Sequence, residues 1–266
     1  MHALETVFAA LWDQYATLTP QAHEIRTLLV DRGEMVVNDH VAFRTFDDPR
    51  LGIDRIAKPF LHLGYEAKDT YRFEQKKLFA RYYQHPDPSL PKVFVSELLL
   101  SEFSQELQDT VRGLIDQMPD GVMGKEEGLT MGRPWSVDSE TYERLAAESE
   151  YAGWMAAFGF CANHFTVFVN ALKGFDKIED LAAFIEENGY PMNRSGGLIK
   201  GSEEVALAQC STLASQVPVA FSDGEKTVPS CYYEFAQRFE REDGTLYQGF
   251  VAASADKIFE STDRQR

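Results

Sequence analysis

Hydrophobic side chains recur at helical spacing over the first 34 residues. Between positions 4 and 15 they fall every three or four residues, which is typical of a helix with one buried face. Thr19 followed by Pro20 is typical of the start of a second helix, and Gly33 of its end. We therefore expect a helical hairpin over residues 1–34.

Two later segments show the same order of patterns. In each, an alternating strand pattern comes first, a helical pattern ending at a glycine follows, and three further strand patterns close the segment. The segments span residues 39–101 and 163–240. We expect a helical insertion between them over 102–160, and a C-terminal segment after them over 241–266.

Polar landmarks in the two segments also match. An aspartate–histidine pair opens the first segment, an asparagine–histidine pair opens the second, and a Gly-Tyr pair ends each predicted helix. From His40 to Tyr65 the spacing is 25 residues, and from His164 to Tyr190 it is 26. Such an internal repeat indicates two copies of one supersecondary unit. We expect a single α+β domain over 1–266, in which two βαβββ modules form a curved sheet.

The polar faces of the predicted strands carry the candidate chemistry. Side chains alternate across a strand, so His40 and His164 each lie on the polar face of the first strand of a module. The last strand of each module adds a glutamate, Glu97 or Glu234, and we expect these two to occupy equivalent positions. Two imidazoles and one carboxylate bind Fe(II) in non-haem sites and zinc in catalytic sites. Each histidine is also compatible with a structural, hydrogen-bonded position, and Glu97 with a ligand, an acceptor next to a ligand or a solvated residue.

Charge limits the partners of such a site. The chain has 42 acidic and 26 basic residues, a net charge of −16, and no cluster of basic residues, which argues against nucleic acid or an anionic membrane as a partner. An anionic small molecule would need a local positive charge to bind. Arg44 shares the face of His40 and suits the capture of a carboxylate, with a surface ion pair as an equal alternative.

The compartment is predicted from the same data. No apolar run approaches the roughly 20 residues of a membrane span, and the N-terminus lacks the basic start of a signal peptide. The three cysteines, Cys161, Cys210 and Cys231, have no disulfide or zinc-cluster spacing. We expect a cytoplasmic protein with reduced thiols and no membrane contact.

Four sequence blocks resemble a known family. NDHVAFRTF, GRPW, ANHFTVF and VPSCYYEFAQRF are similar, in this order, to conserved blocks of the 2-oxoadipate dioxygenase/decarboxylase family, which is related to the vicinal oxygen chelate superfamily. The resemblance runs from about residue 5 to residue 250. It implies that His40, His164 and Glu234 hold Fe(II) and that Arg44 binds the substrate. The choice of Glu234 over Glu97 comes from this resemblance.

The resemblance also implies an activity. In that family O2 oxidises 2-oxoadipate to 2-hydroxyglutarate with loss of CO2, a step of lysine catabolism, so the expected partners are a small 2-oxo acid and O2. A second interpretation is a glyoxalase-type lyase, isomerase or hydrolase that uses Zn or Ni, with Glu97 as a fourth ligand or base. A third is a ligand-binding module without catalysis.

Overall fold

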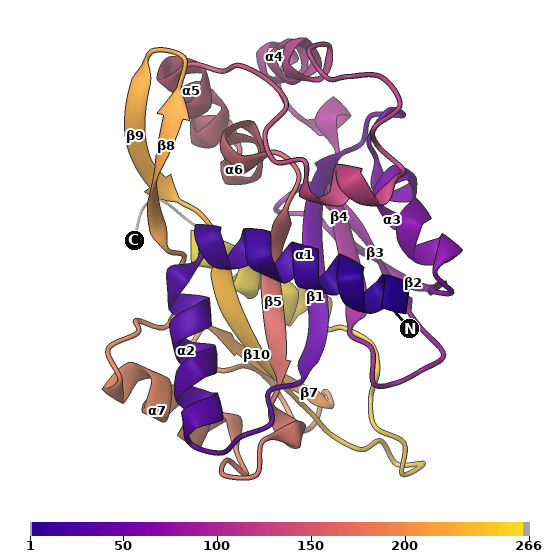
Figure 1. Ribbon diagram of the computed structural model, residues 1–266, viewed down its shortest axis with the longest axis vertical. Coiled ribbons are helices and arrows are strands. Elements are labelled where there is room, and N and C mark those ends of the chain that lie inside the picture. Colours follow the sequence, from indigo (N-terminus) through magenta and orange to yellow (C-terminus); the bar gives the residue numbers. More distant parts are fainter. Residues whose placement is uncertain (1, 263–266) are drawn as a thin grey trace.

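One curved sheet of eight strands forms the centre of the computed structural model, which describes residues 2–262 (Figure 1). The strand order is β2-β3-β4-β1-β5-β10-β7-β6. In chain order the strands are β1 (Asn38–Phe46), β2 (Glu66–Phe73), β3 (Leu78–Gln84), β4 (Lys92–Leu98), β5 (Ala162–Phe168), β6 (Lys200–Ser202), β7 (Leu207–Ser211) and β10 (Tyr232–Arg238).

The two predicted βαβββ modules are the two halves of this sheet. In the first, β1 is followed by α3 (Ile53–His62) and by β2, β3 and β4; in the second, β5 is followed by α7 (Ile178–Glu187) and by β6, β7 and β10. The first and last strands of each module pair in parallel, and the modules meet where β1 and β5 pair antiparallel. The predicted fold class is confirmed.

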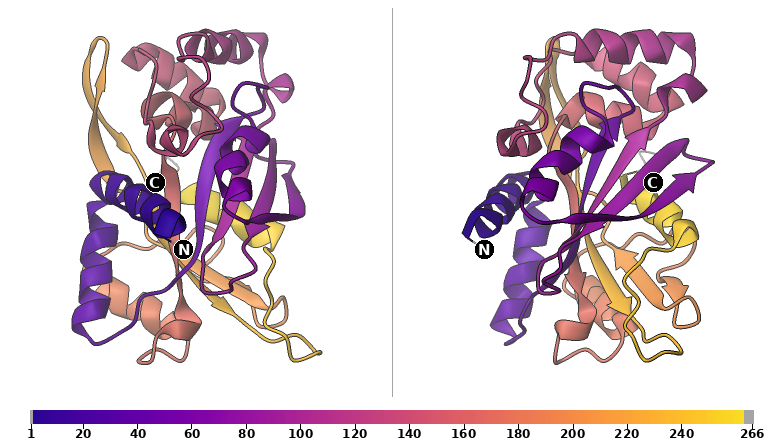
Figure 2. Two further views of the ribbon diagram at one scale, coloured as in Figure 1. Left: turned by 45° about the vertical axis from the view of Figure 1, so that its right-hand side comes forward. Right: turned by 90° about the vertical axis from the view of Figure 1, so that its right-hand side faces the viewer.

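Helices cover one face of the sheet. The predicted helical hairpin is confirmed as α1 (His2–Leu18) and α2 (Pro20–Asp31), and these lie with α3 and α7 on that face (Figures 1 and 2). Aromatic side chains form the contact, as between Trp12 of α1 and Phe165 of β5 at 5.2 Å between ring centroids. The yellow C-terminal helix, α8 (Ala252–Ile258), lies on the opposite face (Figure 2). That face also carries the polar residues of β1, β5 and β10, since Ile258 of α8 lines one cavity with His40, His164 and Glu234.

The predicted helical insertion consists of α4 (Gln105–Ile115), α5 (Ser139–Glu148) and α6 (Glu150–Phe158) at one end of the sheet (Figure 1). A hairpin of β8 (Gln216–Phe221) and β9 (Gly224–Pro229) packs beside α5, and sequence analysis did not predict it. Its turn contains Asp223-Gly224, a common hairpin signal. Three 3-10 turns, η1 (Leu100–Glu102), η2 (Glu126–Thr130) and η3 (Val169–Ala171), complete the connections before α8, and η4 (Phe259–Thr262) follows it.

The GRPW block attaches this insertion to the start of β5. Gly132 and Phe160 exchange two backbone hydrogen bonds of 2.8 Å, and the indole of Trp135 donates to the carbonyl of Ala156. Gly159 ends α6 at a φ of 65°, and a Cβ there would lie 2.3 Å from the Gly132 carbonyl oxygen. Glycine is therefore required at this close approach. Within residues 2–262, no helix is long and apolar enough to cross a membrane.

Candidate metal centre

Three side chains from the middle of the sheet converge at one point. His40 of β1, His164 of β5 and Glu234 of β10 each offer a ligand atom, and these atoms all lie within 4.8 Å of one another. His164 Nε2 lies 3.2 Å from Glu234 Oε2, and His40 Nε2 lies 3.7 Å from Glu234 Oε1. All three side chains are buried. The sequence-predicted set is therefore brought together by the pairing of β1, β5 and β10.

The residue before each histidine orients its ring. Asp39 Oδ2 lies 2.8 Å from Nδ1 of His40, and Asn163 Oδ1 lies 3.1 Å from Nδ1 of His164. An acceptor at Nδ1 favours the tautomer whose proton is on Nδ1, which leaves the Nε2 lone pair for a metal. In both modules, the residue before the histidine therefore orients the ring so that Nε2 points into the site.

Gln209 of β7 engages one oxygen of the carboxylate. Its amide nitrogen donates to Glu234 Oε1 at 2.6 Å, while its own Oε1 is buried without a hydrogen-bond partner in residues 2–262. Because Oε1 of Glu234 already accepts this hydrogen bond, ligation of a cation through Oε2 alone is favoured. The unpartnered Gln209 oxygen can accept a hydrogen bond from a water or ligand at the same point.

The electrostatics of the three groups fit a bound cation. Burial raises the pKa of Glu234 to about 8. Burial also lowers the pKa of His40, and burial together with the neighbouring His40 holds the pKa of His164 well below its usual range. Two neutral imidazoles and a desolvated carboxylate form a donor set suited to a divalent transition metal.

Arg44 lies farther along the same face and is not at the surface. Its side chain is 1% exposed, Nη1 lies 3.0 Å from Glu150 Oε1, and Nη2 donates to Thr262 Oγ1 at 3.0 Å. The guanidinium also lies over the rings of Tyr151 and Trp154, at about 5 Å from each. The surface ion pair considered from the sequence is therefore wrong, because the residue is a buried part of the same polar layer.

The strand register corrects the expected equivalence of Glu97 and Glu234. Glu234 pairs with Thr166, two residues after His164, so its counterpart should pair with Ala42, two residues after His40. The residue that pairs with Ala42 is Phe94, while Glu97 pairs with Thr45. Glu97 is three positions from the equivalent site, and an odd shift places a side chain on the opposite face of a strand.

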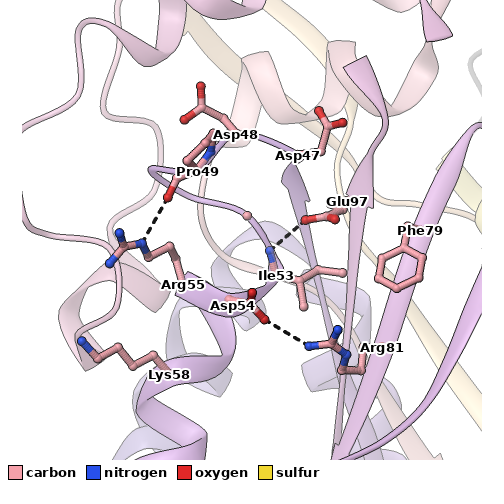
Figure 3. A pocket seen from close by; sticks show the side chains of 11 residues that line it. Asp47, Asp48, Pro49, Ile53, Asp54, Arg55, Lys58, Phe79, Arg81 and Glu97 are labelled. Carbon is pink, nitrogen blue, oxygen red and sulfur yellow. Dashed lines mark hydrogen bonds and ion pairs between the residues drawn. The ribbon is translucent and has the colours of Figure 1, made fainter. Parts of the chain in front are cut away.

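Glu97 consequently lies outside the histidine site. Its Oε2 accepts a 2.9 Å hydrogen bond from the backbone N–H of Ile53 at the start of α3, inside a surface pocket of about 520 Å³ (Figure 3). Burial raises the pKa of its carboxyl group. A role as fourth metal ligand or base at His40 and His164 is excluded by this position.

A C-terminal strap, residues 247–262, closes the polar face over the histidine site. Phe250 of the strap stands edge-on to the His40 ring at 4.8 Å between centroids, and Ile258 also lines the cavity. The cavity left beside His40, His164 and Glu234 has a volume of about 20 Å³. That space holds about one water molecule.

A buried ion pair links the strap to the first histidine. Arg238 Nε and Nη2 donate to the two carboxylate oxygens of Asp39 at 2.6 and 2.8 Å, and Asp39 in turn contacts His40. Arg238 Nη1 donates to the carbonyls of Tyr247 and Gly249 in the strap. Although burial opposes ionisation, Arg238 holds the pKa of Asp39 well below its usual range.

Sequence analysis missed several residues of the site. The repeat identified Asp39 and Asn163 as landmarks without their role at Nδ1. Alternation placed Arg238 on the face of Glu234 without a role, and Gln209 and Phe250 were not identified. The Asx-His repeat was a usable signal for the first two residues. The other three come from β7, the far end of β10 and the strap, where the local pattern carries no information about the neighbour across the sheet.

Comparison with known proteins adds family information to this geometry. The family model described as 2-oxoadipate dioxygenase/decarboxylase matches residues 2–120 and 128–242, which include β1, β5 and β10. A protein of Arabidopsis thaliana named 2-oxoadipate dioxygenase/decarboxylase, chloroplastic, is 37% identical over 257 residues, which cover 86% of this chain and 68% of that protein. Because that relative is chloroplastic, the cytoplasmic location of this chain stays a prediction.

Two solved structures match the whole fold. The hydroxyglutarate synthase of Oryza sativa, solved in complex with 2-oxoadipate, has a TM-score of 0.90 and 32% identity, with 98% of this chain and 92% of that chain covered. A structure from Shewanella frigidimarina, provisionally named a hydrolase, also has a TM-score of 0.90, with 48% identity and coverage of 94% and 98%.

Proposed function

The chain belongs to the 2-oxoadipate dioxygenase/decarboxylase family, and we propose that it uses O2 to convert 2-oxoadipate to 2-hydroxyglutarate and CO2. The reaction balances without a further reductant, because both atoms of O2 are retained in the two products. The observation that carries the proposal is the convergence of His40, His164 and Glu234 in a chain whose matched region contains all three.

We propose these three residues as the ligands of Fe(II). When bound, Fe(II) supplies open coordination positions for the 2-oxo acid and O2, and the electrons that O2 activation requires. Asp39 and Asn163 keep the ring protons on Nδ1, so that Nε2 of each histidine faces the metal. Gln209 holds Oε1 of Glu234, which favours single-oxygen ligation. Zinc or nickel in the same donor set is the alternative, and metal analysis distinguishes them.

The apolar wall of the site has a part in the same reaction. Phe94, Phe250 and Ile258 line the cavity opposite the three polar groups. They exclude water from the reacting oxygen atoms, which protects reactive species from side reactions. A cavity of about 20 Å³ does not admit a six-carbon acid, so binding requires the strap to move.

Arg44 is the proposed partner of the distal carboxylate. It lies on the site face, contributes to the lowered pKa of His164, and carries a buried positive charge in a chain of net charge −16. Glu150 Oε1 and Thr262 Oγ1 contact its guanidinium, and a substrate carboxylate would bind beside these partners or in exchange for one of them. The planar guanidinium can then hold the carboxylate through two hydrogen bonds.

Oxygen consumption tests the proposed function directly. We expect protein reconstituted anaerobically with Fe(II) to consume O2 when 2-oxoadipate is added, and to release equal amounts of CO2 and 2-hydroxyglutarate. Protein loaded with Zn should show no uptake. Stable zinc content with no 2-oxo acid oxidation by the iron form would instead favour the lyase, isomerase or hydrolase interpretation.

Replacing Arg44 by alanine is expected to spare the metal and impair dicarboxylate turnover. The loss of a buried charge partner should cost roughly 2–5 kcal/mol of substrate binding, a factor of about 30 or more in affinity. The measurement is steady-state oxygen uptake with 2-oxoadipate and with 2-oxohexanoate, whose tail has no charge. An equal loss on both acids would show that Arg44 only supports the fold.

Metal binding is expected to strengthen with pH up to about 8. The pKa of Glu234 is raised to about 8 by burial, so the carboxyl group is protonated below that pH and metal must displace its proton. Both histidines are neutral in this range, because burial lowers their pKa. The apparent metal affinity should rise about tenfold per pH unit from pH 6 to 8 and then level off.

The raised pKa also has a consequence for stability without metal. The folded protein keeps the Glu234 proton up to a higher pH than the unfolded chain does, and this difference stabilises the fold at low pH. The stabilisation is complete below pH 4.5 and is lost as pH rises through 8. Calorimetric metal titration and thermal melting at several pH values measure both effects. In Glu234→Gln the pH dependence of the melting temperature should disappear; its persistence would assign it to another group.

A further inference from the structure

Tyr232, at the start of β10, has a buried hydroxyl group that no residue of the described chain satisfies. The side chain is fully buried, and its Oη has no hydrogen-bond partner within residues 2–262. Two other buried tyrosines of the fold are satisfied: Oη of Tyr65 donates to the Pro91 carbonyl at 2.8 Å, and Oη of Tyr151 donates to the Ser96 carbonyl at 2.7 Å. An unpaired buried hydroxyl is costly, so a partner outside the described chain, either a water or a bound ligand, is expected for it.

The ring of Tyr232 packs against the candidate metal centre. It pairs with His164 across β10 and β5 and stacks on the imidazole, with centroids 4.7 Å apart and an interplanar angle of 24°. It also shares a face of β10 with Glu234, two residues farther on. The hydroxyl therefore belongs to the side of the sheet on which a substrate would bind.

Two charged groups of that face act on the hydroxyl. Burial raises the pKa of Tyr232 well above its usual value, Glu234 raises it further, and Arg44 lowers it. Tyr232 therefore lies within electrostatic reach of both the ligand set and the proposed clamp for the distal carboxylate. A phenol hydroxyl is a hydrogen-bond donor suited to an anionic oxygen.

We propose that Tyr232 is a further substrate-binding residue, whose hydroxyl donates a hydrogen bond to an anionic oxygen of the 2-oxo acid held between His164 and Arg44. This role rests on the proposed function. It gives the substrate a third contact, in addition to the metal and Arg44. The hydrogen bond leaves the substrate unchanged and transfers no proton. Its effect is to orient the acid before O2 reacts.

The adjacent residue provides a matched control. Tyr233 is also fully buried, and its hydroxyl has no hydrogen-bond partner in the described part of the chain, but it lies on the opposite face of β10, where its ring is 6.0 Å from Trp12 of α1. An unpaired hydroxyl alone therefore does not indicate a binding role. The position of Tyr232 against His164 and Glu234 distinguishes the two tyrosines.

The experiment compares Tyr232→Phe with Tyr233→Phe in the full chain. Metal content, melting temperature, anaerobic binding of 2-oxoadipate by calorimetry, and KM and kcat from oxygen uptake are measured for both. Loss of a hydrogen bond to a charged group should weaken 2-oxoadipate binding by Tyr232→Phe about 10- to 100-fold. Its metal content should be unchanged, and its melting temperature no lower than that of the wild type, since an unpaired hydroxyl is removed. Tyr233→Phe should bind 2-oxoadipate as the wild type does.

The other possible outcomes contradict either the role of Tyr232 or the proposed function, and they can be told apart. If wild-type protein oxidises 2-oxoadipate and Tyr232→Phe binds it within twofold of wild type, the role of Tyr232 is wrong and the proposed function stands. If Tyr232→Phe loses metal or melts well below both wild type and Tyr233→Phe, the hydroxyl is structural and the role is again overturned. If wild-type protein neither binds nor oxidises 2-oxoadipate, the proposed function fails, and this role fails with it.

Discussion

Replacing His164 by alanine is expected to reduce the metal content from about one ion per chain to nearly none, and to abolish oxygen uptake with 2-oxoadipate. His164 supplies one of three ligand atoms that lie within 4.8 Å of one another, and two remaining ligands do not retain a divalent ion through desalting. The fold should persist, because the helices pack on the opposite face of β5 through Phe165. Metal analysis after anaerobic reconstitution, with circular dichroism on the same sample, measures both.

His23 provides the control for this substitution. It is exposed on α2, away from the sheet, so His23→Ala should keep full metal content and activity. A His164→Ala variant that stays folded and still holds one ion per chain would count decisively against the ligand assignment.

A disulfide that holds the strap closed is expected to stop turnover almost completely. The Oγ atoms of Ser211 on β7 and Ser261 in the strap are 2.7 Å apart, so cysteines at these two positions would bring their sulfur atoms close together. The cavity beneath the closed strap is about 20 Å³, so the locked form should exclude 2-oxoadipate. Oxygen uptake of oxidised Ser211→Cys/Ser261→Cys should fall to background and recover on reduction, with metal content unchanged.

The two single variants under the same oxidising conditions are the controls for this lock. The native cysteines Cys161, Cys210 and Cys231 are all buried, so both single variants should keep their activity. Mass spectrometry of peptides establishes that the cross-link has formed. Full activity in a fully cross-linked sample would show that the substrate reaches the site without movement of the strap.

The local patterns of the sequence were sufficient for the elements and for most of the candidate centre. Helical spacing predicted α1 and α2, and alternation predicted the strands of both modules, because each pattern depends only on which face of an element is buried. The repeated Asx-His pair located His40 and His164. Sequence pattern left the choice between Glu97 and Glu234 open, and the resemblance to the family decided it.

The tertiary structure alone decided which residues face one another. Glu97 appeared equivalent to Glu234 because both lie in the last strand of a module, but the pairing of β4 with β1 places Phe94 at the equivalent position. Register is a property of two strands together, and a shift by an odd number of residues moves a side chain to the other face. Neither strand pattern by itself contains that information.

Contacts over long sequence distances account for the remaining differences. Arg44 meets Glu150 and Asp39 meets Arg238, at separations of 106 and 199 residues, and the strap reaches the site from the C-terminal end of the described chain. The sequence by itself determined which side chains are apolar, which alternate and which repeat. Only the packed fold determined that His40, His164 and Glu234 line one buried cavity with Phe250, because burial and electrostatics depend on every element that packs around a group.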